Sequence, residues 1–486
     1  MSTSPGKQPL PLSLLSLAAV LGDAEPWRLV DGNLEADPYQ AIVGPGDLDR
    51  KNDLALLAVT VMPGPQLRQA VELCRRIRHS HPQITIVWGG YFPTQHADTV
   101  LRADYIDFVV RSQGEVPLLR LAAALRQGSS LSDVPGLSWR RDDGSIVHNA
   151  TAPMLPLDDL PDLPYHRVPM ERYLQRTYLG ERTAAHNSSF GCPFSCSFCA
   201  VVAMTNRRWL AQSPARIERV IRHLSDRYGI DSVQMHDMDF FISESRVAEI
   251  AERLTPLGIK WWALGRIDIL MQYSERTWAA MATSGLKMVF SGAESASEQV
   301  LKTMNKGGQA SPSLTLALAE RMRRYGIVPE FSFVIGTPPD PLGDLARTFE
   351  FIRRVKTINP ATEIILYTYT PVPMDATLYS EASRLGFRFP QTLDEWASDS
   401  WQQTSLRRGD GIPWLDATVK RRIRNFERVL NAFYPTTTDR RLTGITRALL
   451  RTAGAWRYAL RLYAAPYELR ALQRLFHYQR PETTGF

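Results

Sequence analysis

The stretch FGCPFSCSFCA, residues 190–200, holds three of the four cysteines of the chain. Cys192, Cys196 and Cys199 follow a C-x3-C-x2-C spacing. Thiolates placed so closely on one loop can bind three irons of a cubane 4Fe–4S cluster and leave the fourth iron open to a small molecule. A structural zinc ion needs four ligands, but the fourth cysteine is remote and His186 stands alone. The loop therefore predicts an iron–sulfur cluster with one open position.

With aromatic Phe198 directly before the last cysteine, this loop resembles the signature of the radical S-adenosylmethionine (SAM) enzymes. The resemblance implies that the cluster binds SAM at its open iron, with Phe198 among the residues beside SAM. It also implies that an electron from the cluster cleaves SAM to a 5′-deoxyadenosyl radical, which takes hydrogen from an unactivated carbon.

The length and composition indicate a globular protein of two or three domains. The chain has 486 residues, of which 44% are hydrophobic and 22% charged. Four cysteines, three of them in one cluster-type motif, argue against a disulfide scaffold and favour the reducing cytoplasm. The apolar stretch 10–21 is expected to form a buried helix, because it lacks the flanks of a signal peptide. No apolar run reaches the ~18 residues that a membrane span needs.

Residues 1–150 alternate between short apolar runs and helical periods. Strands are predicted at Trp27–Val30, Leu54–Val61, Thr85–Trp88 and Phe108–Val110, with helices between them. This alternation is typical of a doubly wound, Rossmann-like α/β domain with a parallel sheet. Ligands of such sheets bind at the carboxyl ends of the strands.

Three segments of this domain resemble the amino-terminal domain of cobalamin-binding radical SAM proteins. They are LPLSLLSLAAVL (10–21), VWGGYFPT (87–94) and IDFVVRSQGE (106–115). The resemblance implies a bound cobalamin. No D-x-H-x-x-G motif occurs, so no histidine is expected on the cobalt. The residues that the resemblance places at the cobalamin are Thr60, Gly89, Gly90, Thr94, Gly114 and Glu115.

Residues 136–149 predict a hairpin that turns at Asp143-Gly144. The proline-rich connector that follows, 151–182, predicts a stiff surface crossing between two domains.

Residues 183–385 alternate again and predict a partial (β/α)6 barrel, the radical SAM core. Polar residues recur where its strands end, as expected for the lined mouth of a barrel. The loop PVPMD, 371–375, is expected to form a substrate wall. By resemblance to radical SAM cores, the residues expected to contact SAM here are Asp237, Arg266, Glu294, Ser295 and Gly336.

Residues 386–486 predict a tryptophan-containing and basic helical region. From Lys420 onward there are 14 Lys and Arg against 4 Asp and Glu, a net charge of +10, and several arginines stand four apart. A helical cap with a solvated basic face explains this pattern. Peripheral docking on an anionic membrane surface, or on an acidic substrate, explains it as well. The aromatic residues there form no nucleic-acid-binding motif.

These patterns and resemblances predict a cytoplasmic, cobalamin-dependent radical SAM enzyme that methylates an unactivated carbon of a small-molecule or lipid-like metabolite. An electron donor such as flavodoxin or ferredoxin is its expected partner. One alternative is a radical SAM oxidative cyclase or rearrangement enzyme acting on a tetrapyrrole-like substrate. The other, from a different class, is a non-catalytic corrinoid or SAM sensor.

Overall fold

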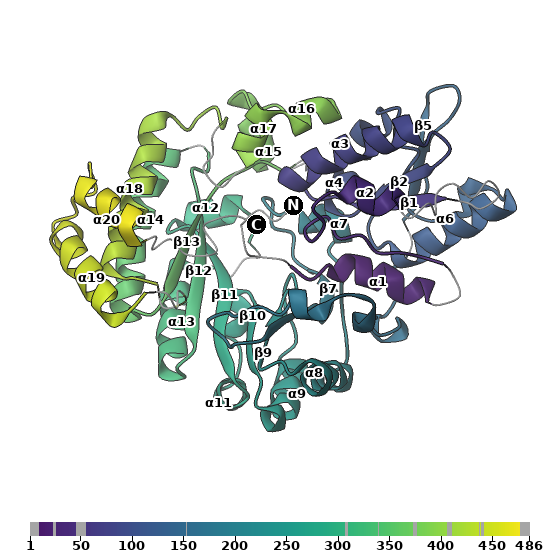
Figure 1. Cartoon of the computed structure of the whole chain (residues 1–486). Helices are drawn as coiled ribbons and strands as arrows, with labels where there is room; N and C mark the ends of the chain where they lie inside the picture. Colours follow the sequence, from purple (N-terminus) through teal and green to yellow (C-terminus); the bar gives the residue numbers. More distant parts are fainter. Residues whose placement is uncertain are drawn as a thin grey trace.

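The chain folds into two α/β parts that lie side by side, with a layer of helices at the far end of the second part (Figure 1). The N-terminal part is the smaller one. The computed structural model describes residues 9–22, 26–44, 55–151, 153–306, 310–338, 340–372, 377–405, 411–436, 438 and 442–476.

The N-terminal part contains a five-stranded sheet in the order β1-β2-β3-β4-β5. The first three strands are parallel, and the last two form the antiparallel hairpin predicted at Asp143-Gly144. The doubly wound parallel core is therefore confirmed. The strands are β1 (Leu56–Thr60), β2 (Thr85–Gly89), β3 (Phe108–Val110), β4 (Leu137–Arg140) and β5 (Ile146–His148). The main helices are α1 (Leu12–Leu21), α2 (Pro38–Val43), α3 (Pro65–Ser80), α4 (Tyr91–Gln95), α5 (Ala97–Leu101) and α6 (Glu115–Gln127).

The prediction of a strand at Trp27–Val30 is wrong, because this segment forms no strand. The Arg28 guanidinium instead donates to the carbonyls of Ala41 and Ile42 at the end of α2. Apolar, β-prone residues form a strand only where a neighbouring strand accepts their backbone hydrogen bonds.

The second part is built on six parallel strands in the order β13-β12-β11-β10-β9-β6. Sequential neighbours with helical crossovers are the arrangement of a partial barrel, as the sequence predicts. The strands are β6 (Thr183–His186), β9 (Ser232–Met235), β10 (Lys260–Leu264), β11 (Leu286–Glu294), β12 (Val328–Ile335) and β13 (Glu363–Thr368). The helices are α8 (Pro214–Tyr228), α9 (Glu244–Leu254), α10 (Ile267–Leu270), α11 (Glu275–Thr283), α12 (Glu298–Thr303), α13 (Pro312–Arg324) and α14 (Pro341–Ile358).

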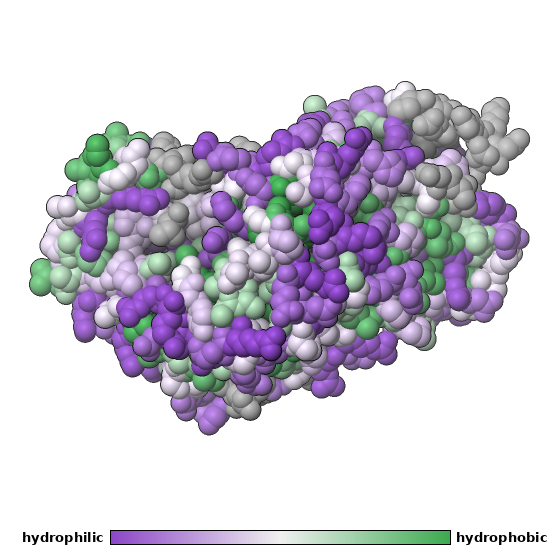
Figure 2. Space-filling model, turned by 90° about the horizontal axis from the view of Figure 1, so that it is seen from below, coloured by the Kyte–Doolittle hydropathy of each residue, from purple (hydrophilic) through white to green (hydrophobic). Residues whose placement is uncertain are grey.

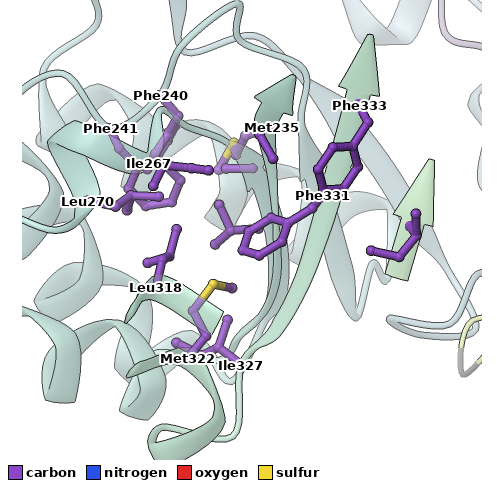
Figure 3. Close-up of a cluster of buried hydrophobic side chains, with 14 of the residues drawn as sticks. Met235, Phe240, Phe241, Ile267, Leu270, Leu318, Met322, Ile327, Phe331 and Phe333 are labelled. Atoms are coloured by element: carbon purple, nitrogen blue, oxygen red, sulfur yellow. The ribbon is translucent and has the colours of Figure 1, made fainter. Parts of the chain in front are cut away.

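The core of the second part lies between this sheet and its helices. Phe331 of β12 points toward Leu318 and Met322 of α13 (Figure 3), and the ring of Phe333, two residues further on, lies 6.2 Å from that of Phe351 of α14. The alternate residues of β12 include Glu330, which is buried and accepts a hydrogen bond from an indole of β10. Both faces of the strand are thus covered, and each fully buried large side chain contributes about 1.5–3 kcal/mol of transfer free energy.

After β13 the chain returns to the N-terminal part. Helices α15 (Thr377–Arg384), α16 (Leu393–Ala397) and α17 (Asp399–Ser405) make this return (Figure 1). Leu393 and Trp396 are buried within the same hydrophobic cluster as α3 and β2. Two ion pairs flank this contact, Arg75 to Asp394 at 2.6 Å and Arg68 to Asp399 at 2.5 Å.

The last three helices, α18 (Ala417–Phe433), α19 (Gly444–Ala459) and α20 (Tyr467–Phe476), cover α14. The rings of Phe349 and Phe426 stack there with centroids 3.8 Å apart. Among the described helices, none is long and apolar enough to cross a membrane. The exact boundaries of the four regions expected from the sequence remain predictions. These regions are 1–150, 151–182, 183–385 and 386–486.

Candidate active site

The cysteine loop lies between a short strand pair and a one-turn helix. Strand β7 (Ser189–Gly191) precedes it and pairs with β8 (Trp209–Ala211), and α7 (Val201–Thr205) follows Cys199. Gly191 has a φ of 88°, and a Cβ there would overlap the carbonyl oxygen of Arg208. Only glycine fits at the start of the loop, because the backbone of the partner strand passes so closely.

The segment after α12 fixes the middle of the loop. The amide of Ser197 donates to Met304 O at 2.9 Å, and its hydroxyl donates to Thr303 O at 3.0 Å. The side-chain amide of Asn305 donates to Ser195 O at 3.0 Å. This support comes from more than a hundred residues further along the chain, and no signal in the sequence predicts it.

The three cysteines lie close enough to influence one another's titration. Burial raises the pKa of Cys192 to about 12 and that of Cys199 to about 11, while the amides of Phe194 and Val201 donate to these two sulfurs and oppose the rise. The described residues contain no group of three or more His, Cys, Asp or Glu side chains arranged around one metal ion. A cubane does not require such a group, since each thiolate binds its own iron.

The surroundings of these thiols suit a cluster. Backbone amides aimed at cysteine sulfurs stabilise the thiolate form, and such hydrogen bonds also tune iron–sulfur clusters. Iron replaces the thiol protons on binding, because coordinating thiols are deprotonated. We conclude that Cys192, Cys196 and Cys199 fit a 4Fe–4S cluster.

Arg266, at the end of β10, contacts the cysteine loop. Its guanidinium forms a two-pronged ion pair with Asp268, with distances of 3.0 and 2.7 Å. Its third nitrogen lies 3.4 Å from Cys196 Sγ. The guanidinium also stacks on Phe194 of the loop, 3.7 Å from the ring centroid. A buried cation at the sulfur offsets the negative charge that a cluster would bring.

Glu294, predicted at the end of β11, pairs with a lysine that sequence reasoning missed. Lys306 Nζ lies 2.5 Å from Glu294 Oε1 and also donates to Gly292 O. Both side chains are buried, and Lys306 O accepts from Arg266. Glu294 has a φ of 61°, a left-handed conformation that is costly for a non-glycine residue.

Two aspartates follow β9, and their environments differ. Asp237 accepts from Ser188 Oγ at 3.0 Å and from the Ser189 amide, so its carboxylate holds β7 in place. Asp239 is 2% exposed, yet neither carboxylate oxygen has a hydrogen-bond partner of full geometry. Burial raises the pKa of Asp239 to about 7, against the opposing effect of Arg266. A buried acceptor without a partner is costly unless a ligand satisfies it.

The remaining predicted SAM residues sit at neighbouring strand ends. Ser295 Oγ donates to Asp344 Oδ1 at 2.6 Å in α14. Gly336 has a φ of 78°, and its carbonyl accepts from Trp414 Nε1 at 2.8 Å. Phe198 packs partly buried against the barrel core. Residues 373–375 of the predicted substrate wall lie outside the described residues.

The carboxyl edge of the N-terminal sheet gathers four of the residues predicted at cobalamin. Gly90 has a φ of 94°, and a Cβ there would come within 2.8 Å of Thr60 Oγ1. Thr94 Oγ1 donates to Gly90 O at 2.7 Å and accepts from the amide of Ser112 at 3.0 Å. A Cβ at Gly89 would make only ordinary contacts, 3.6 Å or more, with Val110. Hydroxyls and bare backbone at this edge suit a large polar ligand such as cobalamin.

Gly114 and Glu115 lie at the start of α6 and face α1. Glu115 Oε1 accepts from Ser16 Oγ at 2.5 Å, and a Cβ on Gly114 would lie 3.3 Å from Leu17. Both residues therefore also join the two helices.

This edge of the N-terminal sheet faces the cysteine loop. Ser112 Oγ donates to Met204 O of α7 at 3.0 Å, and α4 packs against α7. Tyr91, which follows Gly90, lies near enough to Cys199 for the thiol to affect its pKa, which burial raises. Sequence reasoning missed Ser112 and Tyr91 as site residues.

Comparison with known proteins identifies both parts. The model of the radical SAM superfamily matches residues 186–352, and the model of the B12-binding domain matches residues 3–122. The chain is a radical SAM enzyme with a B12-binding domain. These domains imply a 4Fe–4S cluster with SAM in the barrel and cobalamin in the N-terminal domain.

Two relatives of this radical SAM enzyme are named for different reactions, one as a methyltransferase and the other as a cyclase. An uncharacterized methyltransferase of Pyrococcus horikoshii is 27% identical over 71% of this chain and 73% of its own. An anaerobic magnesium-protoporphyrin IX monomethyl ester cyclase of Synechocystis is 27% identical over 48% of this chain and 47% of its own. The chain thus spans most of the first relative and about half of the second.

Solved structures share the fold. The methyltransferase TsrM from Kitasatospora setae, with cobalamin and a 4Fe–4S cluster bound, superposes with a TM-score of 0.62, 17% identity and coverage of 79% of this chain and 77% of its own. The enzyme OxsB, with aqua-cobalamin and SAM bound, gives a TM-score of 0.59, 20% identity and coverage of 82% and 54%. At these identities the likeness concerns the fold alone.

Proposed function

We propose that this enzyme methylates an unactivated carbon of a small-molecule or lipid-like substrate held between the two domains. When bound, the cluster with SAM supplies hydrogen abstraction from carbon, and cobalamin supplies the methyl group. The observation that carries the proposal is the contact of α4 and Ser112, at the carboxyl edge of the N-terminal sheet, with α7, the helix that follows Cys199. Two reacting groups must lie close together and be held in place for a transfer between them.

Within the barrel, we assign Asp239 to the amino group of SAM. Its carboxylate is buried beside Arg266 with no hydrogen-bond partner of full geometry, so an ammonium group would satisfy it. Asp237 is also expected from the sequence to contact SAM, but its carboxylate is already engaged by Ser188 and Ser189. Arg266 and the Lys306–Glu294 pair then hold charge around the methionyl end of SAM and exclude water.

The carbon loses a hydrogen atom and gains a methyl group, so two molecules of SAM are consumed for each product, one giving 5′-deoxyadenosine and one giving the methyl group. The test is anaerobic turnover with SAM carrying a deuterated methyl group. A deuterated methyl group in the product, with 5′-deoxyadenosine formed alongside, supports the proposal. Formation of 5′-deoxyadenosine with an unlabelled, cyclised or rearranged product contradicts it.

The second candidate is oxidative cyclisation of a tetrapyrrole-like substrate, favoured by the relationship to the Synechocystis cyclase. The same labelling experiment separates the two reactions. A non-catalytic sensor is disfavoured, because the relatives of this chain are enzymes.

Each turnover would take two electrons from outside the chain, one for the reductive cleavage of SAM and one to return the cobalamin to the form that accepts the next methyl group. We therefore propose an electron donor such as flavodoxin or ferredoxin and a location in the cytoplasm, where an oxygen-sensitive cluster is protected.

A further inference from the structure

The large hydrophobic side chains that remain exposed are concentrated at one end of the molecule. Among the described residues, eleven such side chains are markedly exposed, and eight of them lie in α19, α20 and the turn between them. Figure 2 shows green, hydrophobic residues at the same end as the helices α19 and α20 of Figure 1. These eight are Ile445, Leu449, Trp456, Leu460, Leu462, Tyr467, Leu475 and Phe476.

Four of them form a stripe along α19. Ile445, Leu449, Trp456 and Leu460 follow one another at spacings of four, seven and four, which places them on one face of the helix. Their exposed fractions are 77, 53, 48 and 64%. The opposite face of α19, with Leu450 and Tyr458, is buried in the core. One side of α19 is therefore packed on the protein, and the other side exposes apolar side chains to solvent. Folding requires only the packed side, so the exposed apolar side chains are not needed for it.

Residues 442–467 carry only basic charge, since they contain no Asp or Glu. Arg451 is exposed, but it lies about 120° around α19 from Ile445, and its guanidinium lies over the ring of Phe433. Arg474 is exposed on α20, next to Leu475 in the sequence. Not every basic residue of the region is available. Arg457 is buried and donates to Glu468 Oε2 at 3.0 Å, and Arg461 lies 3.0 Å from Glu350. The solvated basic face expected from the sequence is thus only partly present.

We propose that α19 and α20 dock this enzyme on an anionic phospholipid membrane, with the stripe of α19 entering the headgroup region. Helices that expose Trp and aliphatic residues within a basic region bind such interfaces through apolar burial and charge. Tryptophan favours the boundary between water and acyl chains. A second copy of this chain is the less suitable occupant, since Glu350 and Glu468 at this end are already paired with Arg461 and Arg457 and are not free to bind the arginines of a partner.

The test is flotation of the anaerobically reconstituted full chain with vesicles of phosphatidylcholine alone or mixed with phosphatidylglycerol. Binding to the anionic vesicles is expected, and it should weaken between low and moderate salt, because charges are screened beyond about 10 Å at 0.1 M. The double variant Leu449→Ser/Trp456→Ser should bind at least about tenfold more weakly, since burial of each large apolar side chain is worth about 1.5–3 kcal/mol.

The matched control is Leu342→Ser/Leu385→Ser, two leucines of similar exposure outside α19 and α20. It should bind as the unaltered chain does, and both double variants should keep the unaltered rate of SAM cleavage. Failure of the unaltered chain to float, or equal binding by both double variants, would overturn the proposal. A concentration-dependent dimer without lipid, abolished by Leu449→Ser/Trp456→Ser, would also overturn it and assign the stripe to self-association.

Discussion

Ser112 Oγ donates a 3.0 Å hydrogen bond to the carbonyl of Met204, and this bond joins the carboxyl edge of the N-terminal sheet to the helix that follows the cysteine loop. Ser112 has a φ of 67°, an uncommon conformation. The hydrogen bond from its backbone amide to Thr94 Oγ1 helps to hold this conformation. The backbone at Ser112 is thus shaped to place one hydroxyl across the boundary between the domains.

Replacing this serine should uncouple the two domains. In Ser112→Ala, the loss of one hydrogen bond of about 1 kcal/mol should lower the yield of methylated product per 5′-deoxyadenosine roughly fivefold. Cluster content and SAM cleavage should be retained, since the residue contacts neither cysteine sulfurs nor Asp239. Quantifying both products in one reaction checks this, with the exposed Ser129→Ala as the control. An unchanged product ratio would show that the bond has no part in coupling.

Iron content should depend on three cysteines and not on the fourth. Single changes of Cys192, Cys196 and Cys199 to Ala should abolish iron binding. Cys74→Ala should leave iron bound, because Cys74 is buried in α3 and accepts from Trp88 Nε1 at 3.2 Å. Its cost should be about 1 kcal/mol of unfolding free energy. Iron analysis with anaerobic denaturation checks both results, and loss of iron in Cys74→Ala would contradict the three-ligand assignment.

Substitutions of the two aspartates after β9 should have different effects, one on SAM affinity and the other on stability. Asp239→Asn removes the charge without altering the fold, so SAM affinity should fall about 10- to 100-fold, the value of a charge-assisted hydrogen bond. Asp237→Ala leaves the Ser189 amide without its acceptor and should lower the unfolding free energy by about 1–3 kcal/mol. Isothermal titration of SAM and thermal unfolding of both variants separate the roles. Equal effects on SAM affinity would remove the distinction between them.

Cobalamin binding is better tested at Gly89 than at Gly90. Gly90→Val would strain the fold itself, because Gly90 has a φ of 94° and a Cβ there would come within 2.8 Å of Thr60 Oγ1. Gly89→Leu has room for a Cβ and places a bulky side chain at the ligand edge, so corrinoid affinity should fall while the melting temperature is kept. Gly444→Ala serves as the control, since it lies at a distant helix start with open space and no positive φ. Unaltered corrinoid absorbance in Gly89→Leu would place the ligand elsewhere.

The contact between α16 and the N-terminal domain should weaken in acid. Burial lowers the pKa of His96 to about 4, among the rings of Phe92, Phe389 and Trp396. The unfolded state, with a histidine pKa near 6.5, takes up the proton first, so stability should fall as the pH drops from about 6.5 to about 4. The loss should be up to roughly 3 kcal/mol, and His96→Phe should reduce it. Urea unfolding at several pH values checks this, and the same slope in both proteins would exclude His96.

The site residues that could be predicted from the sequence are those that lie close in the chain to a recognisable motif or strand. The cysteine spacing, the glycines after β2 and the polar residues after successive barrel strands each lie within a few positions of a recognisable strand or motif. Lys306, Asn305 and Ser112 could not be found in this way, because their partners are distant in the chain and only the fold brings them together. Asp237 and Asp239 look alike in sequence, and only their neighbours in space distinguish them. The prediction of a strand at Trp27–Val30 was wrong for a related reason, because a strand forms only beside a neighbouring strand and the sequence does not show where that neighbour lies.

The return of α16 to the N-terminal sheet limits how this protein can be divided. A fragment ending near residue 150 would lack Leu393 and Trp396, which complete its hydrophobic core, and would expose apolar surface on α3. A fragment starting near residue 183 would carry an uncovered Trp396 instead. Domain exchange with another radical SAM protein should therefore transfer residues 386–405 together with the N-terminal sheet, or both halves will tend to aggregate during expression.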